Sequence, residues 1–233
     1  MGMEHLDVEG GYERTDKTQC ICGYSAKYPF CDNTHLKINE KFKKDWNYQI
    51  RTVPKHPNIK EVIPGIYIIN NFISQEEVKE VMDFLKENKN NTLKLKSTDP
   101  NPKMMDNRLI DLKDQDLAIT RIDFNPIFDG LYSPLPIKNI MKYEIGDFFP
   151  PHQDTSVHCP IESDWGLVLY INDDYEGGEL YYPEKSIIYR PKSGDLVIHG
   201  ATEEFAHGTK PIISGTKYIA TTFAFLFPRK ENS

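Results

Sequence analysis

The sequence lacks a long hydrophobic run. Nowhere in its 233 residues does a stretch of about 18 residues stay apolar enough to cross a bilayer. The first residues, Met1 to His5, show no basic stretch followed by an apolar run, so no secretory leader is expected. We therefore expect a soluble protein of the cytoplasm or another intracellular compartment, with no membrane partner.

The sequence also lacks an excess of positive charge. Lys and Arg together number 28 against 35 Asp and Glu, which gives a formal net charge of −7 and a pI near 5.5. This balance offers no broad electrostatic attraction to nucleic acid or to an acidic membrane, although it leaves room for a local basic patch. Nucleic acid is accordingly a disfavoured partner.

Cysteine is scarce, and its placement is uneven. Of four cysteines, Cys20, Cys22 and Cys31 lie close together, whereas Cys159 stands alone. Such a distribution does not suit a disulfide framework. It indicates metal ligation by the first three in a reducing compartment, with Cys159 as an ordinary thiol.

The length and the 39% hydrophobic content allow one sizeable core and one small appended module. Two prolines, Pro54 and Pro57, disfavour a continuous helix or central strand between the two parts. We expect a small metal-binding domain over residues 1–50, a linker over 51–62 and a larger domain over 63–233.

The larger domain begins with an expected strand and helix. Residues 63–69 are apolar and β-branched. Ser74 then precedes Glu77 by three positions, a spacing in which each side chain satisfies a free backbone N–H at a helix start. The helix should bury a stripe against a sheet and end near residues 88–91. The stripe consists of Val78, Val81, Met82 and Leu85.

Short apolar runs separated by turn residues follow from residue 139 onward. This rhythm is typical of a double-sheet antiparallel barrel, so we expect a mainly β fold with flanking helices. The expected strands cover residues 166–171, 179–182, 187–190, 195–199 and 217–227.

His152 and Asp154 form a His-x-Asp pair. Alternate residues of an extended segment project to the same side, so both side chains can reach one ion. A later histidine would complete a facial set of two histidines and one carboxylate, which leaves coordination positions open for a cosubstrate and O₂. His199 and His207 compete for this third position.

The surrounding motifs closely resemble the prolyl 4-hydroxylase branch of the 2-oxoglutarate oxygenases. The resemblance spans residues 141–228 and implies a jelly-roll (double-stranded β-helix) core, bound Fe(II), and 2-oxoglutarate and O₂ as cosubstrates. Ascorbate is then a candidate reductant. The motifs, in order, are Tyr143-x-x-Gly146-x-x-Phe149 before the His-x-Asp pair, Leu169-Tyr170-Ile171-Asn172, Gly177-Gly178-Glu179-Leu180, Gly194-Asp195-Leu196-Val197, and His207 followed by Gly215 and Lys217.

The resemblance selects His207 as the third iron ligand, because that family places a basic residue at the interval that separates His207 from Lys217. His152, Asp154 and His207 would thus be the catalytic ligand set. His199 ends an apolar run and is expected to be a packed or solvated imidazole. His158 is expected to be a loop residue.

The distal carboxylate of 2-oxoglutarate would be costly to bury without a cation. The resemblance makes Lys217 its partner, Tyr170 a hydroxyl donor to the same carboxylate, and Tyr143 a wall of the cosubstrate pocket. Core packing is the alternative for both tyrosines. The Gly177-Gly178 pair is interpreted as a turn, since no following helix or Lys-Ser/Thr indicates phosphate binding.

The N-terminal cluster offers three thiolates and one imidazole. The ligand set Cys20, Cys22, Cys31 and His35 suits structural zinc or an iron–sulfur cluster, and spacing leaves both open. The segment resembles the CDGSH iron–sulfur domain, which implies a [2Fe-2S] cluster held by these residues. It departs from that motif at Asn33, where the family usually has glycine.

The leading hypothesis is a 2-oxoglutarate-dependent Fe(II) dioxygenase that carries a [2Fe-2S] redox module. A redox- or 2-oxoglutarate-sensing binding protein without hydroxylase activity is the alternative, and a nucleic-acid demethylase is disfavoured by charge and by Lys217. Residues 92–138, with Arg108 and Arg121, are expected to shape the substrate side. Family analogy favours a peptidyl proline or another protein side chain as substrate, and a homodimer is compatible with the CDGSH resemblance.

Overall fold

The computed structural model describes residues 54–88, 92–93, 109–129, 132–154 and 165–225. Several predicted features lie outside these residues: the N-terminal module over 1–50 with Cys20, Cys22, Cys31 and His35, the predicted loop position of His158, the predicted ordinary thiol of Cys159, and Arg108. The division into a module, a linker and a larger domain stays a prediction.

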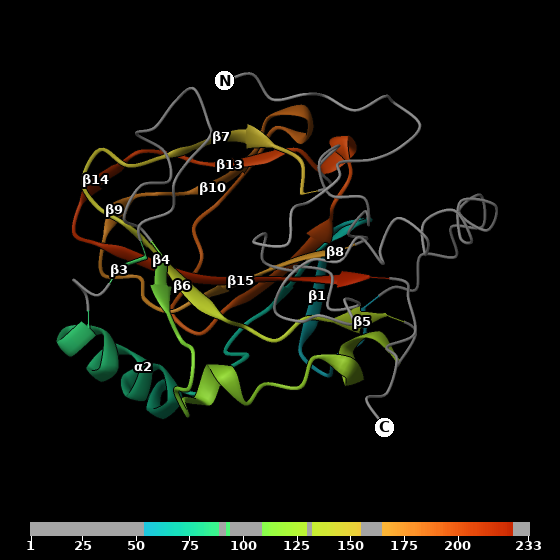
Figure 1. Cartoon of the computed structure of the whole chain (residues 1–233). Helices are drawn as coiled ribbons and strands as arrows, with labels where there is room; N and C mark the ends of the chain where they lie inside the picture. Colours follow the sequence, from blue (N-terminus) through green and yellow to red (C-terminus); the bar gives the residue numbers. More distant parts are fainter. Residues whose placement is uncertain (1–53, 89–91, 94–108, 130–131, 155–164, 226–233) are drawn as a thin grey trace, which may run out of the picture.

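A large antiparallel sheet is the main element of the described structure (Figure 1). Nine strands within the described residues belong to it, and β5 joins at the side by pairing with β15. In spatial order the other strands are β1 (Ile59–Ile63), β2 (Ile66–Ile69), β12 (Leu196–Gly200), β8 (Trp165–Tyr170), β15 (Lys217–Phe225), β6 (Asn139–Tyr143), β4 (Leu109–Asp111) and β3 (Thr92–Leu93); β5 covers Ser133–Pro134.

A smaller sheet lies opposite the large one. Figure 1 shows β7, β13 and β10 as a layer across from β8 and β15, with α2 beyond the large sheet. Within the described residues the small sheet has four strands, and a separate two-stranded ribbon joins β14 to β9. The small sheet runs β11 (Ile187–Tyr189), β10 (Leu180–Tyr182), β13 (His207–Thr209) and β7 (Phe149–His152); the ribbon pairs β14 (Ile212–Ser214) with β9 (Glu176–Gly177).

The central strands β8 and β12 of the large sheet are buried on both faces, which explains their continuous apolar runs. All six residues of β8 are buried. Trp165, Leu167 and Leu169 join a core cluster that also contains the buried face of α2. Val168 and Tyr170 alternate with them and join a second cluster that includes small-sheet residues. The strand periodicity therefore sorts residues between an outer, helix-covered core and an inner core between the sheets.

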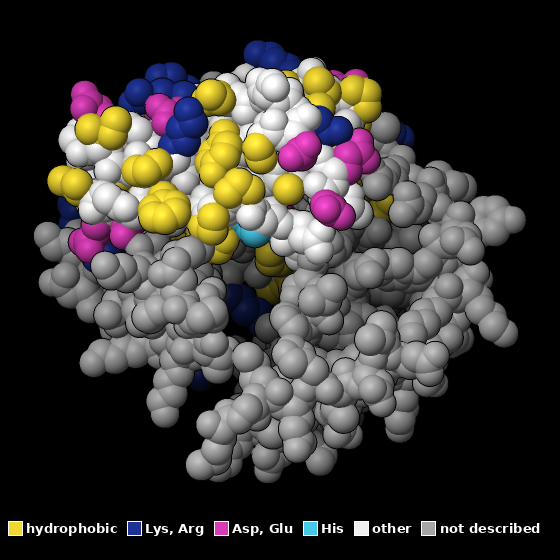
Figure 2. Space-filling view, turned by 90° about the horizontal axis from the view of Figure 1, so that it is seen from above, with side chains coloured by type: hydrophobic (Ala, Val, Ile, Leu, Met, Phe, Trp, Pro, Cys, Tyr) yellow, Lys and Arg dark blue, Asp and Glu magenta, His cyan; other side chains and the backbone are white. Residues whose placement is uncertain are grey.

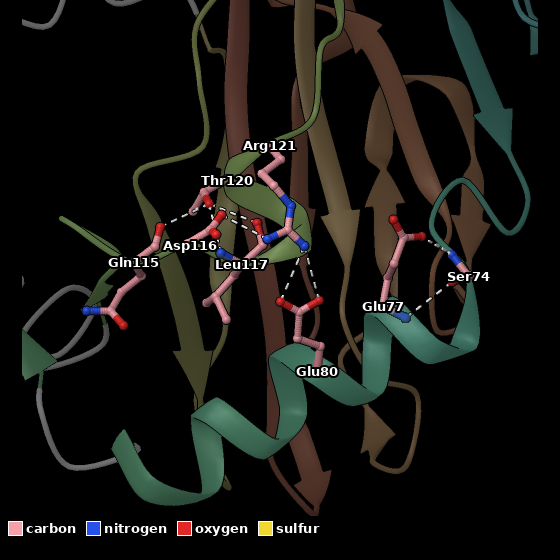
Figure 3. Close-up of polar contacts among 8 residues, drawn as sticks. All are labelled: Ser74, Glu77, Glu80, Gln115, Asp116, Leu117, Thr120 and Arg121. Atoms are coloured by element: carbon pink, nitrogen blue, oxygen red, sulfur yellow. Dashed lines mark hydrogen bonds and ion pairs between the residues drawn. The ribbon is translucent and has the colours of Figure 1, made fainter.

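Helix α2 (Gln75–Asn88) starts and ends as the sequence predicts. The Ser74 backbone N–H donates to Glu77 Oε2 at 2.7 Å, and the Glu77 N–H donates to Ser74 Oγ at 3.2 Å, as Figure 3 shows. Val78, Val81 and Leu85 are buried in the outer core. The reciprocal cap and the apolar stripe together hold the helix against the sheet.

Arg121 links α2 to the short helix η2 (Ala118–Thr120). Its guanidinium lies 2.8 Å from Asp116 Oδ1 and 3.4 Å from Glu80 of α2 (Figure 3). These ion pairs place Arg121 on the helix-covered side of the large sheet. The inner core between the sheets lies on the other side, so the position of Arg121 does not support its expected role in shaping the substrate side.

Five of the predicted strands correspond to β8, β10, β11, β12 and β15. Their ends agree with the prediction within a residue or two where the chain is described. The fold is mainly β with few helices, consistent with a jelly-roll core. The remaining short helices are η3 (Asn125–Phe128), η4 (Pro183–Lys185) and η5 (Glu203–Phe205). Among the described residues, the helices are all too short or too polar to reach across a bilayer.

Candidate active site

The small sheet brings His152 and His207 together. His152 ends β7 and His207 begins β13, and the antiparallel register pairs them directly. Their ring centroids are 4.5 Å apart, as expected for residues opposite each other on neighbouring strands. Asp154 lies two residues beyond His152, just after the end of β7, and its carboxylate approaches both imidazoles.

The three side chains converge on one point. Asp154 Oδ1 lies 3.6 Å from His152 Nε2 and 3.9 Å from His207 Nε2. One ligand atom from each residue falls within 4.8 Å of the others. Two imidazole nitrogens and a carboxylate oxygen thus surround a shared position, and such a set could hold a divalent cation.

The backbone orients both imidazoles in the same way. His152 Nδ1 lies 3.0 Å from the carbonyl oxygen of Pro150, and His207 Nδ1 lies 3.2 Å from that of Phe205. Each Nδ1–H can donate to its carbonyl, which leaves the lone pair on Nε2 directed towards Asp154. Metal-binding histidines usually have their second nitrogen held in this manner.

Burial sets the ionisation of these groups. It lowers the pKa of His207 to about 3 and also lowers the pKa of His152, so both imidazoles stay neutral at physiological pH. Burial raises the pKa of the Asp154 carboxyl to about 7. Neutral imidazoles and a carboxylate whose charged form is costly are the groups that a bound cation would stabilise. The His152 side chain is 35% exposed, so the site is open on that side.

His199 lies directly beside this set. As expected it is packed, and its ring is fully buried. Its centroid is 4.0 Å from that of His207, and its Nε2 is 3.4 Å from Asp154 Oδ2. The sequence did not indicate this closeness, because the pairing of β12 with β8 brings His199 to the Asp154 carboxylate from a different sheet.

Tyr182 backs the histidines from β10. Its ring centroid is 5.7 Å from His199 and 5.8 Å from His207, and its hydroxyl has no hydrogen-bond partner within the described residues. Burial is the main cause that raises the pKa of this tyrosine. The hydroxyl therefore stays protonated and available as a donor beside the site. Sequence reasoning missed Tyr182, whose strand was predicted without a role.

Lys217 is a buried cation in the inner core. Its side chain begins β15 and is fully buried, and its Nζ donates to the carbonyl oxygen of Gly178 at 2.8 Å. Burial lowers the pKa of the amine to about 7. An ammonium in such surroundings is costly without an anion, so the position suits recognition of a carboxylate.

Three tyrosine rings surround the amine of Lys217. Its Nζ lies 5.1 Å from the ring centroid of Tyr170, 5.4 Å from that of Tyr143 and 5.8 Å from that of Tyr175. Tyr143 and Tyr170 were predicted there. Tyr175 was missed, although its hydroxyl is buried without a hydrogen-bond partner among the described residues. The one available signal was its place just before the Gly177-Gly178 turn.

That turn has the conformation that the glycine pair predicts. Gly177 has φ +75° and Gly178 has φ +67°, values that only glycine adopts at little cost. The turn joins β9 to β10 and carries the Gly178 carbonyl to Lys217. A Cβ on Gly178 would meet Ile212 and Tyr175. The glycines thus serve the packing around Lys217 rather than a phosphate.

The structure brings the predicted residues into two neighbouring groups. His152, Asp154 and His207 form the first, and Lys217 with Tyr143 and Tyr170 forms the second. The inner core cluster contains Tyr143, Tyr170 and Tyr182, so it reaches from the surroundings of Lys217 to the rings behind the histidines.

Sequence comparison matches this part of the chain to a known superfamily. Residues 139–225 match the family model of the 2OG-Fe(II) oxygenase superfamily. A protein of Acanthamoeba polyphaga mimivirus, provisionally named a prolyl 4-hydroxylase, is 22% identical over 192 residues, which cover 71% of this chain and 76% of the viral protein. Prolyl 4-hydroxylase 1 of Arabidopsis thaliana is 27% identical over 122 residues, covering 40% of this chain and 43% of the plant protein.

Solved structures share the fold. A Pseudomonas putida prolyl-4-hydroxylase superposes with a TM-score of 0.52 at 16% identity, covering 69% of this chain and 92% of the bacterial one. A Trichoplax adhaerens prolyl hydroxylase, solved with a hypoxia inducible factor peptide, superposes with a TM-score of 0.50 at 16% identity, covering 84% and 96%. The family match, the two named relatives and the site geometry thus make residues 139–225 similar to prolyl 4-hydroxylase-like members of the 2OG-Fe(II) oxygenase superfamily.

Proposed function

We propose that this protein is a 2-oxoglutarate- and Fe(II)-dependent dioxygenase that hydroxylates a protein side chain, with a peptidyl proline as the favoured target. The observation that carries the proposal is the convergence of His152, Asp154 and His207, with the buried Lys217 packed against the same inner core cluster. One group suits a cation and the other suits an anion. 2-Oxoglutarate joins both requirements, since one end chelates a metal and the other is a carboxylate.

The donor set fits Fe(II). Two neutral imidazole nitrogens and one carboxylate oxygen are a donor set that suits Fe(II) in oxygenases. In this assignment His152, Asp154 and His207 would hold the metal. The carbonyls of Pro150 and Phe205 hold the two rings in the required tautomer. Bound iron supplies the redox chemistry that couples decarboxylation of 2-oxoglutarate to hydroxylation by O₂.

Lys217 is assigned to the distal carboxylate of 2-oxoglutarate. Its buried amine becomes an ammonium when the anion binds, and the pair then forms a charge-assisted hydrogen bond. Tyr170 and Tyr175 present buried rings within 6 Å of the amine; their hydroxyls are candidate donors to the same carboxylate. These residues exclude water and fix the direction in which the cosubstrate enters the metal site.

The overall reaction balances with one substrate and two cosubstrates. The substrate C–H, 2-oxoglutarate and O₂ give the substrate C–OH, succinate and CO₂. One oxygen atom enters the hydroxyl and the other enters succinate. Ascorbate is a candidate reductant for cycles that end without substrate hydroxylation.

The relatives support the proposal of a peptide substrate. The Arabidopsis relative is named a prolyl 4-hydroxylase, and the structure of the Trichoplax prolyl hydroxylase contains a peptide fragment. Large apolar side chains are exposed on this protein, among them Ile145, Phe148, Ile188 and Ile213, and Figure 2 shows hydrophobic side chains gathered on the described surface. Such a surface suits an extended peptide better than a nucleic acid.

The test is substrate capture with isotopic oxygen. The full-length protein is incubated with Fe(II), 2-oxoglutarate, ¹⁸O₂ and a protein extract, and succinate and peptides are analysed by mass spectrometry. We expect stoichiometric succinate and a peptide that gains one ¹⁸O. Binding of 2-oxoglutarate without any succinate would instead support a sensing role.

Variants assign the activity to the site. His152→Ala and His207→Ala should each abolish succinate formation, because each removes a ligand. His56→Ala is the matched control, since His56 contacts Phe72 away from the site. Full succinate formation by His207→Ala would refute the ligand assignment.

We further propose that residues 1–50 hold a [2Fe-2S] cluster through Cys20, Cys22, Cys31 and His35. The support is the spacing of the four ligands in the sequence. The cluster would return oxidised iron to Fe(II) or report the redox state. Dimerisation through this module stays a prediction.

A further inference from the structure

His199 is a buried imidazole whose hydrogen-bonding capacity is not used within the described structure. It lies on β12, directly opposite Gly166 of β8, and projects towards the inner core. Its ring is fully buried, and neither ring nitrogen has a hydrogen-bond partner among the described residues. Burying an imidazole in this way costs free energy, so the position calls for a role.

The two oxygens of Asp154 have different neighbours. Oδ1 lies nearest to the Nε2 atoms of His152 and His207, whereas Oδ2 lies 3.4 Å from Nε2 of His199. The group of ligand atoms within 4.8 Å of one another contains His152, Asp154 and His207 but not His199. His199 therefore stands behind the carboxylate rather than beside the metal position.

Gly166 keeps the space between His199 and Asp154 free. A Cβ at this position would collide with Asp154 Oδ2 and would lie 2.7 Å from His199 Nε2. The backbone of Gly166 does not have the positive φ that demands glycine, so the requirement is steric. The glycine on one strand and the histidine on the next thus leave room for one contact, between the imidazole and the carboxylate.

We propose that His199 is a positioning residue of the metal site: its Nε2–H donates to Oδ2 of Asp154 and holds Oδ1 towards His152 and His207. A neutral imidazole carries one N–H, and the nitrogen that faces a carboxylate oxygen is the one that carries it. The present 3.4 Å separation is longer than the optimum of about 2.9 Å, so a small rotation of the carboxylate completes the bond. This role rests on the proposed function, because it takes Asp154 as a metal ligand.

The bond would act on metal affinity. A ligating carboxylate that is held in one orientation pays less conformational entropy on binding, and loss of such an outer partner typically weakens metal binding about 10- to 100-fold. His199→Phe keeps a flat buried ring but removes the donor. His199→Gln can place an amide N–H close to the position of Nε2, so it is the conservative variant that should restore the contact.

The experiment measures Mn(II) binding to the full-length, metal-free protein by electron paramagnetic resonance of the free ion, without 2-oxoglutarate. Mn(II) prefers carboxylate and imidazole to a thiolate-rich cluster, and loss of binding in His207→Ala assigns the signal to this site. Thermal melting of each metal-free variant is recorded in parallel. Ile198→Val is the matched control, because Ile198 is the neighbour of His199 on β12 and faces the outer core.

We expect His199→Phe to bind Mn(II) about 10- to 100-fold more weakly, with a metal-free melting temperature that is not lowered. His199→Gln should recover most of the affinity, and Ile198→Val should bind like the unaltered protein. Gly166→Ala, on the opposite strand, should also weaken Mn(II) binding. It replaces His199→Phe in the test if that variant does not fold.

Equal Mn(II) affinity in the unaltered protein and His199→Phe would overturn the inference, as would a Gln variant that binds no better than Phe. The proposed function has a separate readout. Mn(II) affinity that depends on His199, in a protein that forms no succinate, would support the positioning role and refute the dioxygenase activity.

Discussion

Lys217 shows how a single residue can join stability to cosubstrate binding. Its amine is buried among three tyrosine rings and bonds to one backbone carbonyl. Burial lowers its pKa to about 7, so near neutral pH the free protein holds a mixture of amine and ammonium. The dianion 2-oxoglutarate binds the ammonium form, which couples cosubstrate binding to the uptake of a proton.

Cosubstrate affinity should therefore fall as the pH rises above about 7. Below that pH Lys217 is already charged and the affinity levels off; above it the dissociation constant for 2-oxoglutarate should increase about tenfold per pH unit, the linkage expected for one proton. Calorimetric titration of the Mn(II)-loaded protein with 2-oxoglutarate between pH 6 and 9 measures this dissociation constant. In Lys217→Arg the charge persists at every pH, so any remaining binding should lose this dependence. A flat profile in the unaltered protein would contradict the assignment.

Lys217→Met should change the pH dependence of stability in the metal-free protein. The pKa of the amine is about 7 in the folded protein and near 10.5 in the unfolded chain. Burial of the charged amine therefore destabilises the folded protein most below pH 7, and this destabilisation disappears above about pH 10.5. The free energy of unfolding of the Met variant, minus that of the unaltered protein, should thus be about 2 kcal/mol larger at pH 7 than at pH 9. Urea denaturation at both values tests this. An identical difference at the two pH values would show that the amine is not buried as described.

At the scale of elements, the site depends on pairing between strands that are distant in sequence. His152 and His207 meet only because β7 pairs with β13 in one register. A shift of that register by one residue would turn one imidazole to the opposite face. The large sheet, covered on its outer face by α2, is the support on which this pairing rests, so changes at α2 should affect stability without altering the site.

Ser74→Ala should lower the free energy of unfolding by about 1 kcal/mol, because it removes the side-chain acceptor of the Glu77 N–H at the start of α2. Glu77→Gln is the matched control, since glutamine can still reach back to the Ser74 N–H, and its effect should be smaller. Mn(II) affinity should be unchanged in both variants, because α2 packs on the outer core. Weakened metal binding in Ser74→Ala would show that the helix supports the site more directly.

At the scale of the whole molecule, the chain combines two proposed metal centres that share no ligand. His152, Asp154 and His207 come from the oxygenase core, while the cluster ligands lie within residues 20–35. The two centres differ in their preferred metals: the first offers imidazole and carboxylate, and the second offers mainly thiolate. They should therefore be separable by mutation.

Anaerobically purified protein should be coloured by a [2Fe-2S] cluster, whereas zinc at the same ligands would be colourless. His35→Cys should keep the visible absorption and lower the reduction potential, because a thiolate adds negative charge. Initial rates of succinate formation measured with fresh Fe(II) and ascorbate should not change. Stoichiometric zinc, with no acid-labile sulfide and no visible band, would end the iron–sulfur hypothesis and leave the oxygenase assignment intact.

Much of this arrangement could be read from local sequence patterns. The Ser74 and Glu77 cap and the end of α2 follow from spacing, because they depend on residues close in sequence. The positions of strands β8, β12 and β15 follow from their short apolar runs between turn residues, whereas their pairing partners do not. The alternation within β15 that turns Lys217 inward follows the same rule. The motif order also indicated the ligand set, although it could not say how the side chains would meet.

The sequence by itself determined that His152 and Asp154 can reach one ion, since only one residue separates them. Tertiary structure alone decided which histidine stands opposite His152 and that His199 lies behind the Asp154 carboxylate. It likewise decided that Tyr175 packs near Lys217. These relations depend on the register and stacking of strands far apart in the chain, and no local pattern encodes the distance between two such strands.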